Sequence, residues 1–128
     1  LNKNNTFNIR WVDIYETVYD ISDEEYENYL NGKYEEIRKL LFENCQTKRT
    51  SKYYQVFDMC RLIANKIRLV RIGLNDSRNY GIGQTIEYIK RVIDDMVTEG
   101  LLISAKNNEL IRSLNKTEQK KLKINVAW

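Results

Sequence analysis

Apolar residues recur along this chain at two spacings, and the change between them predicts the order of helices and strands. Residues 6–11, TFNIRW, alternate apolar and polar side chains, which predicts a short strand. Apolar residues then recur every three or four positions through Tyr19, which predicts a helix ending near Asp20. The chain therefore begins with a predicted strand that leads into a helix.

A second helix is predicted from Ser22, because Ser22 and Glu25 have the spacing of a capping box. Asn31-Gly32 permits a bend or break, after which the helical pattern resumes towards Cys45. Residues 46–52, QTKRTSK, contain no apolar residue and predict a basic loop. Ser51 is the candidate cap of a third helix from Tyr53 to Ala64.

The second half of the chain predicts a strand at residues 66–72, a glycine-rich loop at 73–83, and a long helix with one apolar stripe. Gly100 lies where that helix needs a left-handed cap. Strands are predicted at residues 101–105, 109–114 and 122–126, with a turn at 106–108. The predicted fold is mainly α with a small β-hairpin, an α+β class, in a single domain over residues 1–128.

Composition favours a folded interaction domain over an enzyme. The 128 residues are 42% hydrophobic, enough to form one core. The chain begins at Leu1 and contains neither an apolar leader nor an 18-residue apolar run, so we expect a domain cut from a larger protein, with no signal peptide and no membrane span. Cys45 and Cys60 fall within helical apolar patterns, which predicts free buried thiols and a reducing compartment.

The residues that most catalytic sites use are missing or isolated. Histidine is absent, which removes the commonest general base and metal ligand, and two separate cysteines cannot form a zinc site. The acidic residues at 23–25 and at Asp94-Asp95 are interpreted as solvated helix faces, although magnesium-dependent phosphotransfer at Asp94-Asp95 is a weaker alternative. Gly81-Ile82-Gly83 lacks the rest of a phosphate-binding motif. We therefore expect no catalytic, cofactor or metal site.

Charge is distributed unevenly along the chain. Residues 1–45 carry five Lys/Arg against ten Asp/Glu, and residues 46–128 carry sixteen against eight. Such an uneven charge distribution is typical of a protein that binds nucleic acid, but it also makes two copies of one domain electrostatically complementary. The polar face of the long helix is acidic, since Lys90 and Arg91 are outnumbered by four carboxylates through Glu99.

The predicted order, a strand and a helix near the start, then a long amphipathic helix and then a hairpin, is that of a winged helix, whose last helix normally reads DNA. A helix with net negative charge would be repelled by phosphates. If DNA is bound, better candidates are the basic loop at 46–52 and the predicted hairpin region. The candidate nucleic-acid contacts there are Lys116, Lys120, Lys121 and Lys123.

Residues 6–20, 84–110 and 122–126 resemble the C-terminal winged-helix domain of the origin recognition complex large-subunit family, most of all its yeast silencing branch, the third silent information regulator proteins. On this match, residues 23–80 form an insertion between the second and third helices, and one of its helices replaces the missing first helix. The predicted fold is thus a winged-helix variant with a helical insertion.

The resemblance implies a nuclear, non-catalytic domain of a silent-chromatin scaffold that homodimerises and so cross-links chromatin-bound chains. Other silencing or chromatin proteins are further possible partners. The alternative is a DNA-binding winged helix of a replication-origin protein. Candidate dimer-interface residues are the aromatic or apolar residues beside loops and charges: Tyr53, Tyr54, Phe57, Ile82 and Tyr88.

Overall fold

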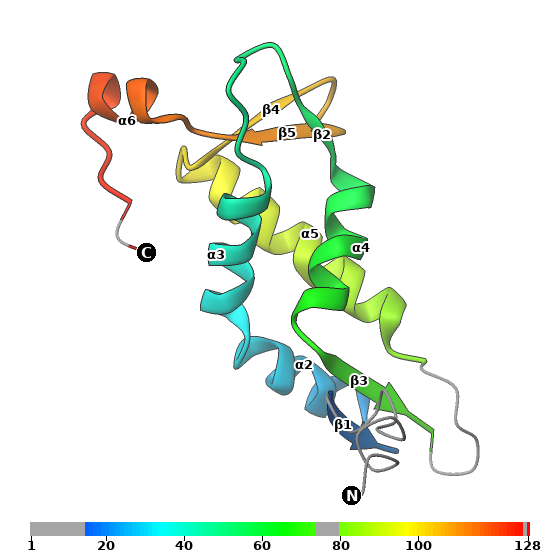
Figure 1. The fold of residues 1–128 in the computed structure, drawn as a ribbon. Helices are drawn as coiled ribbons and strands as arrows, with labels where there is room; N and C mark the ends of the chain where they lie inside the picture. The colour runs from blue at the N-terminus through cyan, green and yellow to red at the C-terminus, as the bar shows by residue number, and fades with distance from the viewer. Residues whose placement is uncertain (1–14, 74–79, 127) are drawn as a thin grey trace, which may run out of the picture.

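A bundle of three helices forms the centre of the molecule in the computed structural model, which describes residues 15–73, 80–126 and 128 (Figure 1). The bundle consists of α3 (Tyr34–Asn44), α4 (Val56–Lys66) and α5 (Ile82–Thr98), each in contact with the other two. The described elements outside the bundle are β1 (Glu16–Tyr19), α2 (Asp23–Asn31), β2 (Tyr54–Gln55), β3 (Leu69–Ile72), β4 (Leu102–Ala105), β5 (Leu110–Ser113) and α6 (Lys116–Leu122). The chain is therefore mixed α and β, as predicted, with two small sheets.

The predicted capping box defines the start of α2. Ser22 Oγ accepts a hydrogen bond from Glu25 N at 3.1 Å, and the Glu25 carboxylate accepts one from Ser22 N at 3.4 Å. The chain breaks at Gly32, and α3 continues in a new direction (Figure 1). The predicted break at Asn31-Gly32 is confirmed.

The helix predicted to end near Asp20 is wrong where the structure describes it. Residues Glu16–Tyr19 form strand β1, which pairs in parallel with β3 from Glu16 opposite Leu69 to Tyr19 opposite Ile72. Only Val18 of β1 is buried, because alternate residues of a strand point to opposite faces. The strand predicted at residues 6–11 lies outside the described residues.

The helix predicted from Tyr53 begins three residues later, at Val56, because Tyr54 and Gln55 pair with β5 as strand β2. Ser51 is not its cap: Gln55 occupies that position and makes no side-chain cap hydrogen bond. The basic loop at 46–52 is confirmed. The strand predicted at 66–72 is present as β3 but begins only at Leu69, because α4 extends to Lys66.

The long helix and the hairpin agree with the prediction. Gly100 follows α5 with φ +84°, the left-handed conformation that favours glycine. Strands β4 and β5 pair in antiparallel register, with Leu102 opposite Ser113 and Ala105 opposite Leu110. Together with β2 they form a sheet in the order β2-β5-β4.

The strand predicted at 122–126 is wrong. Residues Lys116–Leu122 form helix α6, whose capping box joins Asn115 Oδ1 to Glu118 N at 2.8 Å and Asn115 N to Glu118 Oε1 at 3.0 Å. The end of α6 turns sharply, because Lys123 adopts φ 57°. The described residues after Lys123 form neither helix nor strand.

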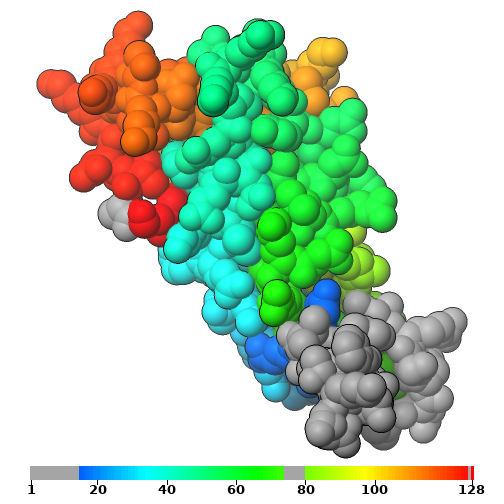
Figure 2. All heavy atoms as spheres, viewed as in Figure 1, coloured from blue at the N-terminus to red at the C-terminus, as the bar shows by residue number. Residues whose placement is uncertain are grey.

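The core lies between α3, α4 and α5 and extends under the hairpin. Its fully buried side chains include Ile37, Leu41, Ile63, Ile89 and Ile111. Cys45 and Cys60 are free and buried, as predicted, and burial raises the pKa of each thiol to about 12. The molecule is elongated, with α6 projecting at one end and α2 at the other (Figure 2).

Candidate interaction surfaces

The solvent-facing side of α5 is acidic, and ion pairs engage both of its cations. Arg91 binds Glu27 of α2 through two hydrogen bonds, from Nη1 at 3.3 Å and Nη2 at 2.8 Å, which lowers the pKa of Glu27. Lys90 Nζ lies 3.7 Å from Glu87 Oε2. Asp94, Asp95 and Glu99 add three carboxylates, and although Arg38 of α3 donates to Glu99 at 2.6 Å, negative charge remains in excess on this surface.

A hollow of about 620 Å³ lies between α2, α3 and α5. Asp94 and Asp95 line it, but Asp95 already accepts a hydrogen bond from Tyr34 Oη at 3.1 Å. Among the described residues, no group of three or more Asp, Glu, Cys or His side chains is placed to hold a metal ion. The carboxylate pair of the magnesium alternative thus has no third ligand of these types beside it in the described residues.

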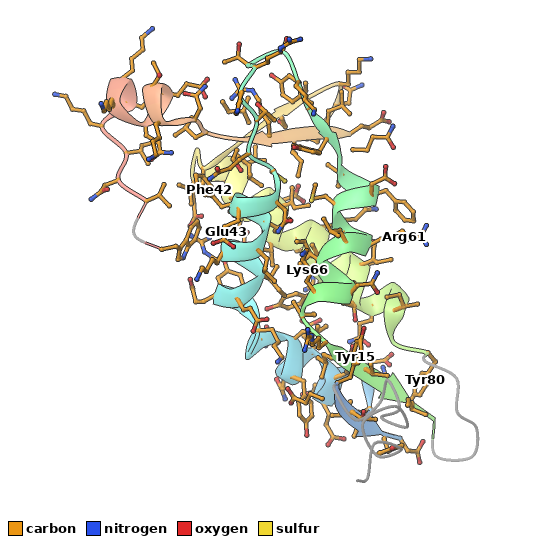
Figure 3. The ribbon with its side chains drawn as sticks, in the orientation of Figure 1. Tyr15, Phe42, Glu43, Arg61, Lys66 and Tyr80 are labelled. Carbon is orange, nitrogen blue, oxygen red and sulfur yellow. The ribbon has the colours of Figure 1, made fainter. Side chains whose placement is uncertain are left out.

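A second groove, of about 520 Å³, lies where the start of α4, the helix α5 and the β4–β5 turn meet; we call it the Phe57 groove. Phe57 lines it and is 52% exposed, an unusual exposure for a phenylalanine. The lining residues are Gln55, Val56, Phe57, Lys90, Lys106, Asn108, Glu109 and Leu110. Further along α4, Leu62 is also exposed, and Arg61 points into solvent (Figure 3).

The structure separates the predicted interface residues into three environments. Tyr53, Tyr54 and Phe57 lie together at the junction of β2 and α4, and the two tyrosines are half-buried. Ile82 is exposed, but it is the first residue of α5, which begins near the C-terminal end of α4, whereas Phe57 lies at the N-terminal end of α4 (Figure 1). Tyr88 is buried, and its hydroxyl donates to Asn31 Oδ1 at 2.8 Å, so its ring faces the interior.

The candidate nucleic-acid lysines lie on α6 and its cap, not on a hairpin, which corrects the prediction. All of them are exposed, as are the cations of the loop between α3 and β2. We call these residues together the basic end: Lys48, Arg49, Lys52, Lys116, Lys120, Lys121 and Lys123. In Figure 1 the loop and α6 lie at the same end of the molecule.

Arg112 of β5 connects the two segments of the basic end. It is buried, and its Nε donates to the carbonyl of Thr50 in the loop at 3.0 Å. Its Nη1 and Nη2 donate to the two Glu118 oxygens of α6 at 2.8 and 2.9 Å. These bonds lower the pKa of Glu118 to about 2. Sequence reasoning missed Arg112. It also missed the start of α6, although Asn115 and Glu118 have the same capping-box spacing as Ser22 and Glu25, which predicted α2.

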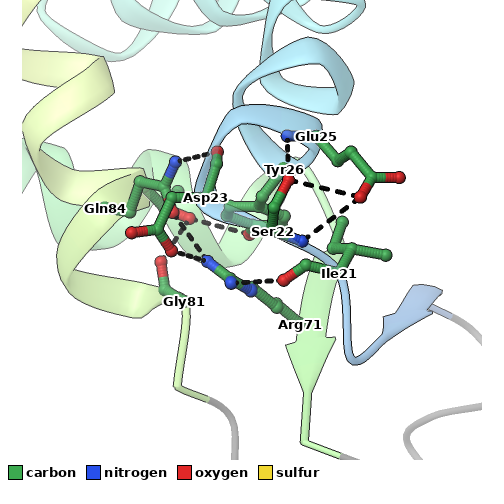
Figure 4. A network of polar contacts seen from close by, with 9 residues as sticks. Ile21, Ser22, Asp23, Glu25, Tyr26, Arg71, Gly81 and Gln84 are labelled. Carbon is green, nitrogen blue, oxygen red and sulfur yellow. Dashed lines mark hydrogen bonds and ion pairs between the residues drawn. The ribbon is translucent and has the colours of Figure 1, made fainter.

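A second buried arginine lies at the end of the molecule formed by β1, β3 and the acidic first turn of α2 (Asp23, Glu24 and Glu25), which we call the acidic end. Arg71 of β3 donates from Nη1 to Asp23 Oδ1 at 2.7 Å and to Gln84 Oε1 at 2.8 Å, and from Nη2 to the Ile21 carbonyl (Figure 4). Its guanidinium also lies 4.3 Å from the centre of the Tyr80 ring. Sequence reasoning missed Arg71 too; the signal was a charged residue inside the apolar strand LVRI.

Gly81 is required by close packing against Arg71. A Cβ at Gly81 would lie 2.8 Å from Arg71 Cβ and 3.1 Å from Tyr26 Cε2. The glycine of the Gly81-Ile82-Gly83 motif is thus explained by packing. We expect Gly81→Ala to lower the free energy of unfolding by about 1–3 kcal/mol, measured by urea denaturation.

Gly83 provides the matched control. It lies in the first turn of α5, and a Cβ added there would meet nothing within 4 Å. Gly83→Ala is therefore expected to leave stability unchanged or to raise it by about 0.5–1 kcal/mol. Equal effects of the two substitutions would contradict the packing explanation.

Comparisons with known proteins find no matching family model, no matching curated protein and no matching solved structure. The structure also contains, within the ranges it describes, no helix long and apolar enough to cross a membrane.

Proposed function

We propose that this chain is a non-catalytic winged-helix variant that homodimerises through the Phe57 groove. The observation that carries the proposal is an exposed phenylalanine at the edge of a groove that the same chain presents. The resemblance described above adds a cellular setting to the proposal: a nuclear silent-chromatin scaffold whose chains the dimer cross-links.

The order of the central elements supports the winged-helix part. Along the chain, α3, β2, α4, α5 and the β4–β5 hairpin follow one another, and β5 lies between β2 and β4 in the sheet. In this arrangement α3 serves as the first helix of the core and α5 as the third. The addition between α4 and α5 then contains β3, which pairs with β1 from before α2, and it is shorter than residues 23–80.

The surface of α5 supports an interaction role other than DNA reading. In a winged helix the third core helix enters the major groove. Here Arg91 is held by Glu27 and Lys90 lies beside Glu87, so neither cation of α5 is free, and Asp94 has no cation partner among the described residues. Phosphates would be repelled from such a helix.

The Phe57 groove has the properties of a symmetric contact. In a twofold dimer the same patch occurs on both copies, so each Phe57 can enter the groove of the other. An aromatic side chain in a desolvated pocket is a typical energetic centre of an interface. The groove carries both charge signs, with Lys90 and Lys106 near Glu109, and like patches of mixed sign are self-complementary.

Light scattering at tens of micromolar protein tests the proposal. We expect the mass of a dimer for the chain and the mass of a monomer for Phe57→Glu, because burying an unpaired carboxylate in the pocket costs several kcal/mol. Phe57 is exposed within one copy, so the substitution leaves the fold intact, which circular dichroism checks.

Tyr19→Glu is the matched control, since Tyr19 is 54% exposed on β1. It introduces the same charge and removes an aromatic ring of similar exposure, yet the mass should remain that of a dimer. A monomeric mass for the unmodified chain would refute the proposal. So would an equal loss of dimer in Phe57→Glu and Tyr19→Glu.

A further inference from the structure

We infer that the basic end is a binding site for the phosphate backbone of duplex nucleic acid, reached through α6 and the 46–52 loop and not through α5. This site is separate from the Phe57 groove, and the inference goes beyond the proposed dimerisation. It rests on the placement of the cations, their lack of acidic partners among the described residues and the rigid connection between the two segments.

The lysines of α6 form a row. Lys116, Lys120 and Lys123 follow at intervals of four and three residues, the spacing that places side chains on one face of a helix. They also line one shallow groove of about 380 Å³ together with Gln119, Ile124 and Asn125. With a rise of about 1.5 Å per residue, the row extends over roughly 10 Å.

The cations of the basic end have no ion-pair partner among the described residues. The one carboxylate within α6, Glu118, is turned towards Arg112, which holds both of its oxygens. The row is therefore not neutralised by its own helix. Lys52 is additionally placed over the ring of Tyr54, at 5.8 Å.

Arg112 keeps the two basic segments in a fixed relation. Its bonds to Thr50 and Glu118 come from one planar guanidinium, so the loop and α6 are held by the same buried group. A preorganised set of cations loses less conformational entropy on binding than mobile lysines do.

A regular polyanion fits this surface better than an acidic peptide does. Duplex DNA carries one negative charge per about 1.7 Å of its axis, so a row of cations meets phosphates along its whole length. The groove beside the row is lined mainly by lysines and amide side chains, which are common phosphate contacts. Within this groove Ile124 is the one apolar lining residue, whereas the core of a protein–peptide interface is usually apolar.

Fluorescence anisotropy with a labelled duplex of about 20 base pairs tests the inference, on the whole chain. If the four lysines of α6 and its cap contact phosphates, raising salt from about 50 to about 200 mM should weaken binding roughly 100-fold. The variant Lys116→Gln/Lys120→Gln/Lys123→Gln should bind at least about tenfold more weakly at low salt, with a salt slope smaller by about 3.

The matched control is Lys39→Gln/Lys66→Gln/Arg68→Gln, which removes three exposed cations from other parts of the molecule. Both triple variants lower the formal net charge from +3 to zero. A difference between them therefore reports position and not overall charge. We expect the control to change affinity by less than about threefold.

Three results would overturn the inference. They are the absence of binding at low salt, an equal loss in both triple variants, and binding of polyglutamate as tight as that of DNA, which would indicate an acidic peptide as the ligand. Light scattering separates this inference from dimerisation, because the α6 variant should keep the mass of the unmodified chain.

Discussion

Replacing Arg112 with leucine is expected to lower the free energy of unfolding by about 3 kcal/mol near pH 7. Arg112 is 5% exposed, and its guanidinium donates to Thr50, Ser113 and Glu118. Leucine fills much of the volume but leaves the Glu118 carboxylate, 26% exposed, without its partner. Removing one partner of a buried pair is costly because the remaining charge stays poorly solvated.

The lowered pKa of Glu118 supports the same change in the free energy of unfolding by a second argument. The folded pKa is about 2, against an ordinary value of 4.5. A lowered folded pKa stabilises the protein above the unfolded pKa, and that stabilisation is lost as pH falls towards the folded value. The difference corresponds to about 3 kcal/mol, fully present above about pH 5 and absent near pH 2.

Urea denaturation of both proteins near pH 7 and near pH 2.5 measures this effect. The gap between the unmodified chain and Arg112→Leu should be large near neutrality and should shrink in acid as Glu118 becomes protonated. Arg49→Leu is the control, since Arg49 is exposed in the loop, and its effect should stay within about 0.5 kcal/mol. A gap of equal size at both pH values would contradict the role given to the Arg112–Glu118 pair.

The elements that the sequence predicts correctly are those specified by neighbouring residues. The capping box at Ser22, the apolar stripe of α5 and the left-handed cap at Gly100 act within a few positions of one another. Strand β1 depends instead on pairing with β3, about fifty residues away, so its local pattern favoured the wrong element. Helix α6 has no buried residue and hence no apolar stripe.

The candidate surfaces also combine features that the sequence shows with features that only the structure shows. The acidic character of α5 and the basic character of α6 can be counted from the sequence. Three other features depend on contacts between distant segments and cannot be counted in this way. Glu27 holds Arg91, the ring of Tyr88 faces the interior, and Arg112 joins a loop to a helix. Exposure of Phe57 also required the structure, because its neighbours Val56 and Met59 are buried in the same helix.

Arg71→Leu is expected to destabilise the acidic end by about 2–3 kcal/mol. Arg71 joins the start of α2, the start of α5 and strand β3 through Ile21, Asp23 and Gln84 (Figure 4). The cost should be lower than for Arg112, because the Asp23 side chain is 87% exposed and regains water when its partner is removed. The Ile21 carbonyl and the Gln84 amide lose a charged donor.

Hydrogen exchange distinguishes this local effect from general destabilisation. The Tyr80 amide donates to the Arg71 carbonyl, and the amides of Glu16 and Asp20 donate to the carbonyls of Arg68 and Ile72, so these sites should lose protection first. Arg71→Lys should recover only part of the stability, because an ammonium group cannot replace the two terminal nitrogens of the guanidinium, which bind Asp23 and Ile21 at the same time. Full recovery by lysine, or a loss of protection spread evenly through α3 and β5, would mean that Arg71 does not hold these three segments together.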